Sequence, residues 1–124
     1  MLDLAVAPAD HTFDRPARAP DAYAALVAEI GEDGASEVRA VFWSETQSRL
    51  DLFGTLDLGV HRARIAREAH SLKSAAATFG YVRLAALALR LEKTAETATP
   101  DDFRDLLAAM RSAYLAAVAQ EPQT

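Results

Sequence analysis

Cysteine is absent from the 124-residue chain, which excludes disulfides, thiolate metal sites and cysteine nucleophiles. Basic charge is scarce as well, because 18 acidic residues outnumber 13 lysines and arginines and give a net charge of -5. A protein that binds the phosphates of nucleic acid needs a basic face, so we expect no nucleic-acid partner. No apolar run approaches the roughly 18 residues of a membrane span, and the first residues do not resemble a signal peptide. We therefore expect a cytoplasmic protein with no membrane partner.

The chain contains 51% hydrophobic residues, enough for one compact domain with a core. Residues 1–20 hold three of the five prolines and no sustained apolar period, which predicts a loosely ordered N-terminal arm. The helical pattern covers residues 21–119, which we expect to form the domain, and residues 120–124 are then a C-terminal tail. With Met1 at the start and so short a tail, we expect a complete small protein.

Two helices are expected in the first half of this domain, because apolar residues recur there at offsets of three and four. A short helix follows Pro20 and ends at the glycines of residues 31–34. A longer helix runs from about residue 35 toward Leu56, and Thr46 and Arg49 interrupt its apolar stripe. Its expected apolar stripe consists of Val38, Val41, Phe42, Leu52, Phe53 and Leu56.

Three further helices are expected at about residues 60–79, 84–95 and 100–118. Gly80 is suited to end the first of these, because glycine readily adopts the left-handed backbone that often follows a helix. Thr99 predicts the start of the last helix as its capping residue. Four long amphipathic helices joined by short loops predict an all-α fold, an antiparallel up-down four-helix bundle with a short additional N-terminal helix.

The ring of His70 interrupts a helix made mostly of small and aliphatic residues. His70 lies about 160° around the helix from Leu72, so it faces away from its own helix's apolar stripe. We therefore expect an exposed ring rather than a core histidine. The stripe expected to face the core is Ile65, Ala69, Leu72, Ala76 and Phe79. Phe79 is expected to be a packing residue, and Phe79→Ala to cost about 3–5 kcal/mol if the ring is buried.

The neighbours of His70 favour anion chemistry at the ring. Lys73, one turn on, can reach an anion held by the imidazole, and Arg67, one turn back, adds a second positive charge. Ser74 and Ala77 have little bulk, so another molecule could approach closely. A neutral imidazole has a free ring nitrogen that is a competent nucleophile, and phosphoryl transfer needs mainly positioning and charge neutralisation.

Other chemistries fit the sequence poorly. A di-metal site in a helical bundle needs Glu three residues before His, but Arg67 and Leu58 stand three residues before His70 and His61. The chain has no His-Glu-x-x-His pair for zinc and no Gly-x-Ser-x-Gly turn for a serine hydrolase. The remaining alternative is that His70 and Lys73 are ordinary residues of a solvated helix face.

The stretch HSLKSAAATFGYVRLAALALRLE, which begins at His70, resembles the phosphorylation motif of histidine-containing phosphotransfer (HPt) domains. Ser74 replaces the usual glycine of that motif, and Ala75 occupies a place often taken by serine. The motif positions that this sequence matches or nearly matches are His70, Leu72, Lys73, Ser74, Gly80, Leu84, Leu91 and Glu92.

The resemblance implies a phosphocarrier without ATPase or kinase activity of its own. His70 would accept a phosphoryl group from an aspartyl phosphate on a response-regulator receiver domain and pass it to another receiver or back, and Lys73 would stabilise the bound group. Arg67, Ser74 and Ala77 would contact the partner, which in this family docks on the histidine-bearing helix and the preceding one. The resemblance further implies a monomer that works with a hybrid histidine kinase. No cofactor is expected on this chain, since the receiver carries the Mg²⁺ ion.

Two other functions stay open at this point. One is a pseudo-HPt adaptor that binds a receiver or histidine kinase without turnover, although the intact pair of His70 and Lys73 counts against it. The other is the dimerisation hairpin of a histidine kinase, which ranks well below because such a hairpin usually has a proline shortly after its histidine and an ATP-binding domain behind it, and this chain has neither. We assign no chemical role to His11 or His61. Trp43 and Tyr81 fit either the core or a docking surface.

Overall fold

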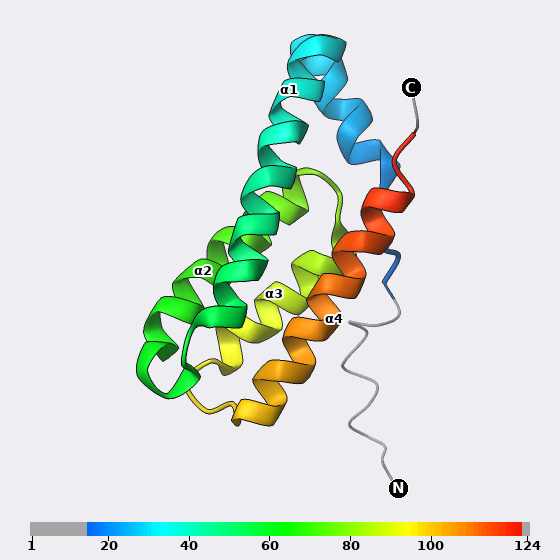
Figure 1. Cartoon of the computed structure of the whole chain (residues 1–124). Helices are drawn as coiled ribbons and strands as arrows, with labels where there is room; N and C mark the ends of the chain where they lie inside the picture. Colours follow the sequence, from blue (N-terminus) through cyan, green and yellow to red (C-terminus); the bar gives the residue numbers. More distant parts are fainter. Residues whose placement is uncertain (1–14, 123–124) are drawn as a thin grey trace, which may run out of the picture.

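The structure is a computed structural model that describes residues 15–122. Within this range the chain is helical and contains no strand, so the all-α prediction is confirmed there. The expectation of a loose arm over residues 1–14 lies outside the described residues, as does the end of the predicted tail. The four helices are α1 (Pro20–Thr55), α2 (Leu58–Thr78), α3 (Val82–Thr94) and α4 (Pro100–Ala119) (Figure 1).

Helix α1 changes direction at Gly31, whose backbone angles of φ 85° and ψ 167° are not helical. Only glycine adopts this combination at low cost, because a Cβ would clash with the neighbouring backbone. Residues 20–30 fold back beside the C-terminal end of α4, and the rest of α1 forms the longest helical run (Figure 1). The break predicted over residues 31–34 is thus confined to Gly31, and Gly34 is helical.

The apolar stripe predicted for α1 is wrong in part. Val38 and Val41 are 43% and 55% exposed, whereas Thr46 is fully buried. The buried residues of α1 are Ala35, Phe42, Thr46, Leu50 and Phe53. Their spacing of seven, four, four and three residues follows one helix face, and the two valines lie off that face. The sequence pattern treated Thr46 as a break in the apolar stripe, but in the structure this threonine belongs to the buried face of α1.

Helix α2 buries the face that the sequence predicts, and α3 and α4 each bury one face as well. All five stripe residues around His70 are buried, as are Leu84, Leu87, Leu91 and Ala95. Thr99 caps α4 in a capping box with Asp102, and Gly80 follows α2 with φ 76°. Both helix-end predictions are confirmed, because a side-chain cap and a left-handed glycine satisfy the unpaired groups at helix ends.

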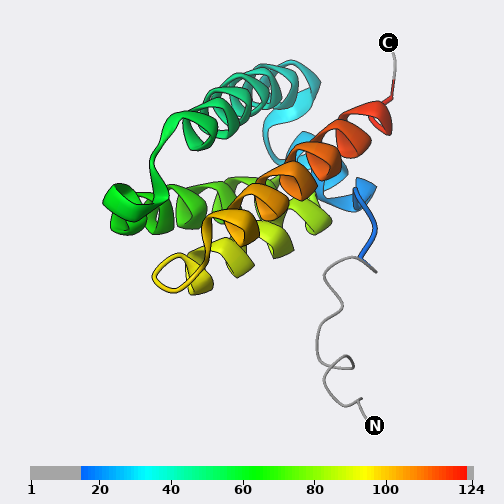
Figure 2. The same ribbon diagram turned by 60° about the horizontal axis from the view of Figure 1, so that its bottom comes forward.

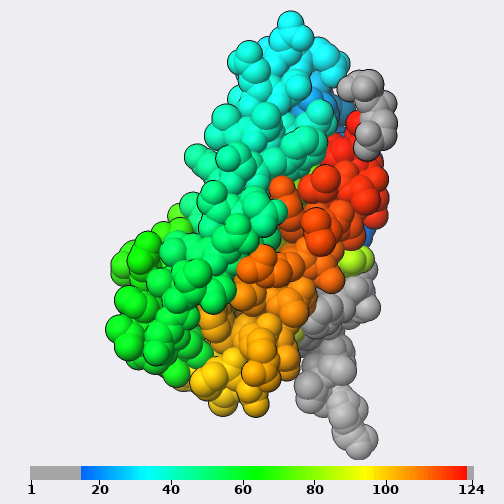
Figure 3. Space-filling view, viewed as in Figure 1, coloured from blue at the N-terminus to red at the C-terminus, as the bar shows by residue number. Residues whose placement is uncertain are grey.

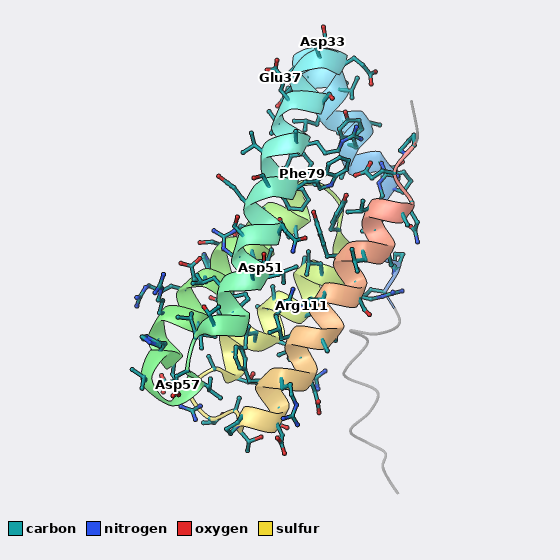
Figure 4. All side chains as sticks on the ribbon, viewed as in Figure 1. Asp33, Glu37, Asp51, Asp57, Phe79 and Arg111 are labelled. Atoms are coloured by element: carbon teal, nitrogen blue, oxygen red, sulfur yellow. The ribbon has the colours of Figure 1, made fainter. Side chains whose placement is uncertain are left out.

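The core joins all four helices. In Figure 2, α2 and α3 lie side by side below α1, and in Figure 3, α1 and α4 meet along the front face. The ring of Phe79 stacks on that of Phe42 with centroids 4.5 Å apart, which packs the end of α2 against α1. Between α4 and α1, Arg111 points toward Asp51, with 3.4 Å between Nη1 and Oδ1 (Figure 4).

Phe79 is 5% exposed, so the condition for the expected cost of Phe79→Ala is met.

Among residues 15–122, no helix has the length and apolar character that a membrane span requires.

Candidate functional site

Helices α2 and α3 form a hairpin that sets the register of the candidate site. At the turn, the amide of Tyr81 donates to the carbonyl of Ala76 over 2.9 Å, and the amide of Gly80 donates to Ala77 over 3.1 Å. At the other end, Nη1 of Arg62 on α2 donates to two carbonyls just after α3, those of Ala95 (2.9 Å) and Ala98 (2.8 Å). The hairpin is therefore fixed at both ends, and residues at equal distances from the turn face one another.

His70 on α2 and Glu92 on α3 occupy such facing positions, each eleven residues from Tyr81. The Nδ1 atom of His70 lies 2.9 Å from Oε2 of Glu92. The His70 side chain is 57% exposed and that of Glu92 is 28% exposed. The expectation of an exposed ring on the water side of α2 is confirmed, and a carboxylate holds one edge of that ring.

Lys73 contacts the same carboxylate. Its Nζ atom lies 3.3 Å from Oε1 of Glu92, so His70 and Lys73 each pair with one oxygen of Glu92. The sequence predicts Lys73 as a cation close to the ring. In the structure, the ion pair with Glu92 holds the Lys73 ammonium group near His70. Since an ammonium group has three N–H donors, Lys73 keeps donors for a second anion while it pairs with Glu92.

The pKa of Glu92 is lower than the ordinary value of a glutamate. Partial desolvation raises this pKa, but the hydrogen bond with His70, the pairing with Lys73 and the charges of both residues lower it by more. Glu92 is therefore ionised at neutral pH and can only accept hydrogen bonds.

An ionised Glu92 determines which ring nitrogen of His70 carries the proton. Because a carboxylate cannot donate, Nδ1 must be the N–H that donates to Oε2 of Glu92. In the neutral ring, Nε2 then carries the lone pair. The side chain of His70 is more than half exposed, and Glu92 pairs with the Nδ1 edge of the ring, so Nε2 is the ring nitrogen that this carboxylate does not engage.

The other candidate residues of the site, Arg67, Ser74 and Ala77, are all exposed on α2. They share the outward side of the helix with His70, in keeping with their predicted positions. Nothing in the structure tests their expected role in partner binding. The described residues contain no group of three or more histidine and carboxylate side chains that could hold a metal ion.

Helix α1 contacts α2 on a different side of α2 from His70. Arg49 of α1 pairs with Glu68 of α2, with Nε 2.9 Å from Oε1. Glu68 stands two residues before His70, which places the two side chains about 200° apart around the helix. The polar group around the ring is therefore built by α2 and α3, whereas the resemblance led us to expect the partner on α2 and the helix before it.

Sequence reasoning missed Glu92 as a member of the site. It appeared only as the end of the matched motif, with no contact assigned to it. The signal that could have found it is its eleven-residue distance from Tyr81 in the turn, which equals that of His70 once α2 and α3 are taken as a hairpin.

Comparison with known proteins gives one match. A family model described as Hpt domain matches residues 37–121, which is well over half of the chain. No curated protein and no solved structure matches the chain.

Proposed function

Since this chain belongs to the Hpt domain family, whose members take part in phosphotransfer in two-component signalling, we propose that His70 is its phosphoryl acceptor. The observation that carries the proposal is the 2.9 Å contact between Nδ1 of His70 and Oε2 of Glu92. With Nδ1 as the donor in this contact, the neutral ring has its lone pair on Nε2, and the side chain is 57% exposed, which suits a nucleophile. The expected donor is the aspartyl phosphate of a response-regulator receiver domain.

The proposed step is a displacement at phosphorus. The lone pair of Nε2 forms the N–P bond, the bond between phosphorus and the aspartyl oxygen breaks, and its electron pair returns to the receiver's carboxylate. The ring gains positive charge as the N–P bond forms, and the adjacent Glu92 carboxylate stabilises that charge through Nδ1–H. Lys73 would bind a phosphoryl oxygen with the donors that Glu92 does not use. Transfer to a second receiver reverses these bond changes.

Partner binding belongs to the same proposal. Arg67, Ser74 and Ala77 would contact the receiver around His70, and the exposed, short side chains of the last two favour close approach. The receiver would supply Mg²⁺, a hybrid histidine kinase would supply the phosphoryl group, and this chain would act as a cytoplasmic monomer. We also propose that residues 21–119 are an antiparallel up-down four-helix bundle in which residues 20–30 add a short N-terminal helix; the break at Gly31 supports this description.

The experiment that tests the proposal is phosphotransfer from receiver domains that carry ³²P-labelled aspartyl phosphate. The wild-type chain should gain a label that is labile in acid and stable in base, as a phosphoramidate is. His70→Gln should abolish labelling. His61→Gln is the matched control, because His61 lies on the same helix, is half-buried and should leave labelling unchanged. Labelling that persists in His70→Gln would exclude His70 as the acceptor.

The same assay separates the carrier from a non-catalytic adaptor. A receiver that binds wild type and His70→Gln with equal affinity, yet labels neither, would favour the adaptor. The contacts of His70 with Glu92 favour the carrier, because an adaptor has no need of an oriented imidazole with one free nitrogen.

A further inference from the structure

Residues 15–30 form an N-terminal strap that lies across the turn between α2 and α3. The amide of Ala19 donates to the carbonyl of Gly80 over 2.7 Å, and Nε of Arg83 on α3 donates to the carbonyl of Arg15 over 2.9 Å. The backbone of the strap lies so close to Gly80 that a Cβ at this position would overlap Ala19 and Ala22. The family match begins at residue 37, so the strap lies outside the matched region.

The strap buries few apolar side chains of its own. Ala17 is its one apolar residue with a fully buried side chain, and Tyr23, Leu26 and Val27 are only half-buried. Ile30, at its end, is 44% exposed. A segment with so little buried apolar area opens more readily than the bundle, unless polar contacts hold it in place.

One buried carboxylate adds three polar contacts to the two hydrogen bonds at the turn. Oε1 of Glu121 lies 3.0 Å from Nη2 of Arg18 and 3.1 Å from Nη1 of Arg39, and Oε2 accepts a 2.7 Å hydrogen bond from the Tyr81 hydroxyl. The side chains of Glu121, Arg18 and Arg39 are only 2%, 7% and 14% exposed. Glu121 thus joins the strap, α1 and the turn after α2, and it does so from a segment that the sequence assigns to a tail.

The surroundings of Glu121 make this contact hard to replace. Burial raises the pKa of Tyr81 well above its ordinary value, and the nearby Glu121 raises it further although the hydrogen bond from Trp43 lowers it, so the phenol remains a donor to Glu121. Arg39 is also held over the rings of Tyr23 and Trp43, at 4.4 and 4.9 Å from their centroids. Without the carboxylate, two arginines would be buried without their anion, which is strongly unfavourable. If the strap moves into water, Arg18 is hydrated again.

The opposite end of the strap contains a hinge. Gly31 joins the strap to the long part of α1, and open space surrounds the position where its Cβ would be. A change in the two backbone angles of Gly31 can therefore swing the strap outward without a clash at the hinge itself.

We propose that residues 15–30 are a hinged strap, latched across the Gly80 turn by the buried carboxylate of Glu121, that opens as one unit about Gly31 while residues 37–119 stay folded. Opening uncovers the turn between the two helices that carry His70 and Glu92, and it leaves the exposed ring of His70 as accessible as before. This inference does not depend on the phosphoryl chemistry of His70.

Amide hydrogen exchange on the full chain, read by mass spectrometry, tests the strap. Glu121→Gln keeps the shape of the side chain and removes its charge, and it should speed exchange of residues 20–30 by at least tenfold. Peptides from residues 60–118 should change by less than twofold. Glu96→Gln is the matched control, because Glu96 is exposed after α3 and should leave the strap's exchange unchanged.

A second variant covers the case in which Glu121→Gln destabilises the whole bundle. Arg18→Gln removes the strap's own partner and leaves Glu121 paired with Arg39, so it should speed exchange in the strap alone. Equal strap exchange in Glu121→Gln and Glu96→Gln would overturn the proposal. Exchange that rises equally over residues 20–118 in Arg18→Gln would overturn it as well, because the strap would then not open as a separate unit.

Discussion

Nδ1 of His70 and Oε2 of Glu92 lie 2.9 Å apart, across the seam between α2 and α3. The carboxylate faces the ring from the next helix, so it fixes the ring's orientation and its proton position without covering Nε2. Lys73 occupies the second oxygen of the same carboxylate, and thus one glutamate holds both the imidazole and the ammonium group. Glu92 is therefore part of the polar group around His70.

Glu92→Gln should slow phosphoryl acceptance by His70 about tenfold or more, because a hydrogen bond to a charged group contributes about 1.5–3 kcal/mol and about 1.4 kcal/mol is a factor of ten in rate. The amide has no negative charge to stabilise the ring as the N–P bond forms, and it can accept from or donate to Nδ1. Nitrogen NMR should therefore find less of the Nδ1–H form in the variant. A wild-type rate together with an unchanged tautomer ratio would show that Glu92 does not orient the ring.

The pairing of Glu92 with His70 and Lys73 should appear in its titration. Because the pKa of Glu92 is lower in the folded state than in the unfolded chain, its ionisation stabilises the fold at neutral pH. That contribution is complete above the ordinary glutamate pKa and is lost as the pH falls through the lowered value. Carbon NMR of the Glu92 carboxyl should give a midpoint below the ordinary one, and His70→Ala and Lys73→Met should each raise it. Midpoints that are the same in all three proteins would contradict the assigned cause.

Much of α2, α3 and α4 could be predicted because their apolar residues follow one unambiguous helical period. The exposure of His70 follows from the same helical wheel. His70 lies about 160° around α2 from the buried Leu72, so its side chain points toward solvent. Thr99 and Gly80 act through contacts with residues nearby in the chain. The sequence alone therefore identifies the helix ends at these two residues, and the structure has helix ends there.

The errors occur where the sequence pattern is ambiguous or the contact is distant. In α1, the sequence allows two apolar faces, one with Val38 and Val41 and one with Thr46. The two valines are more hydrophobic than threonine, yet the structure exposes them and buries Thr46. Only packing against the other helices decides which face is inside. Glu92 was missed because its partner lies on another helix, and a periodic pattern says nothing about which helices become neighbours.

The burial of Glu121 could not be predicted either. A glutamate followed by Pro122 near the end of the chain is typical of a solvated tail, and charged residues are rarely fully buried unless they are paired. Its partners, Arg18 and Arg39, come from positions 103 and 82 residues earlier. Such a cluster depends on the final fold and leaves no local signal.

Gly80→Ala should destabilise the protein by about 2 kcal/mol or more. A left-handed backbone costs a non-glycine residue about 1–2 kcal/mol, and the new Cβ would also push against the strap at Ala19 and Ala22. Gly34→Ala should act in the opposite direction and add up to about 1 kcal/mol, because Gly34 is helical and a Cβ there would make ordinary contact with Ile30. Urea unfolding of both variants measures the difference. Equal effects of the two substitutions would contradict the close approach of the strap to Gly80.

Ser74→Trp should slow phosphoryl transfer from a receiver at least tenfold while it leaves the fold intact. Ser74 is exposed one turn from His70 on the outward side of α2, so an indole there would stand in the path of the receiver on the proposed docking surface. Substitutions at exposed positions usually change stability by less than about 0.5 kcal/mol, and urea unfolding can verify this for the variant. Ser112→Trp is the matched control, because Ser112 is equally exposed but belongs to α4. Transfer to Ser74→Trp at the wild-type rate would mean that receivers approach His70 without covering this part of α2, which would move the docking surface toward α3 and Glu92.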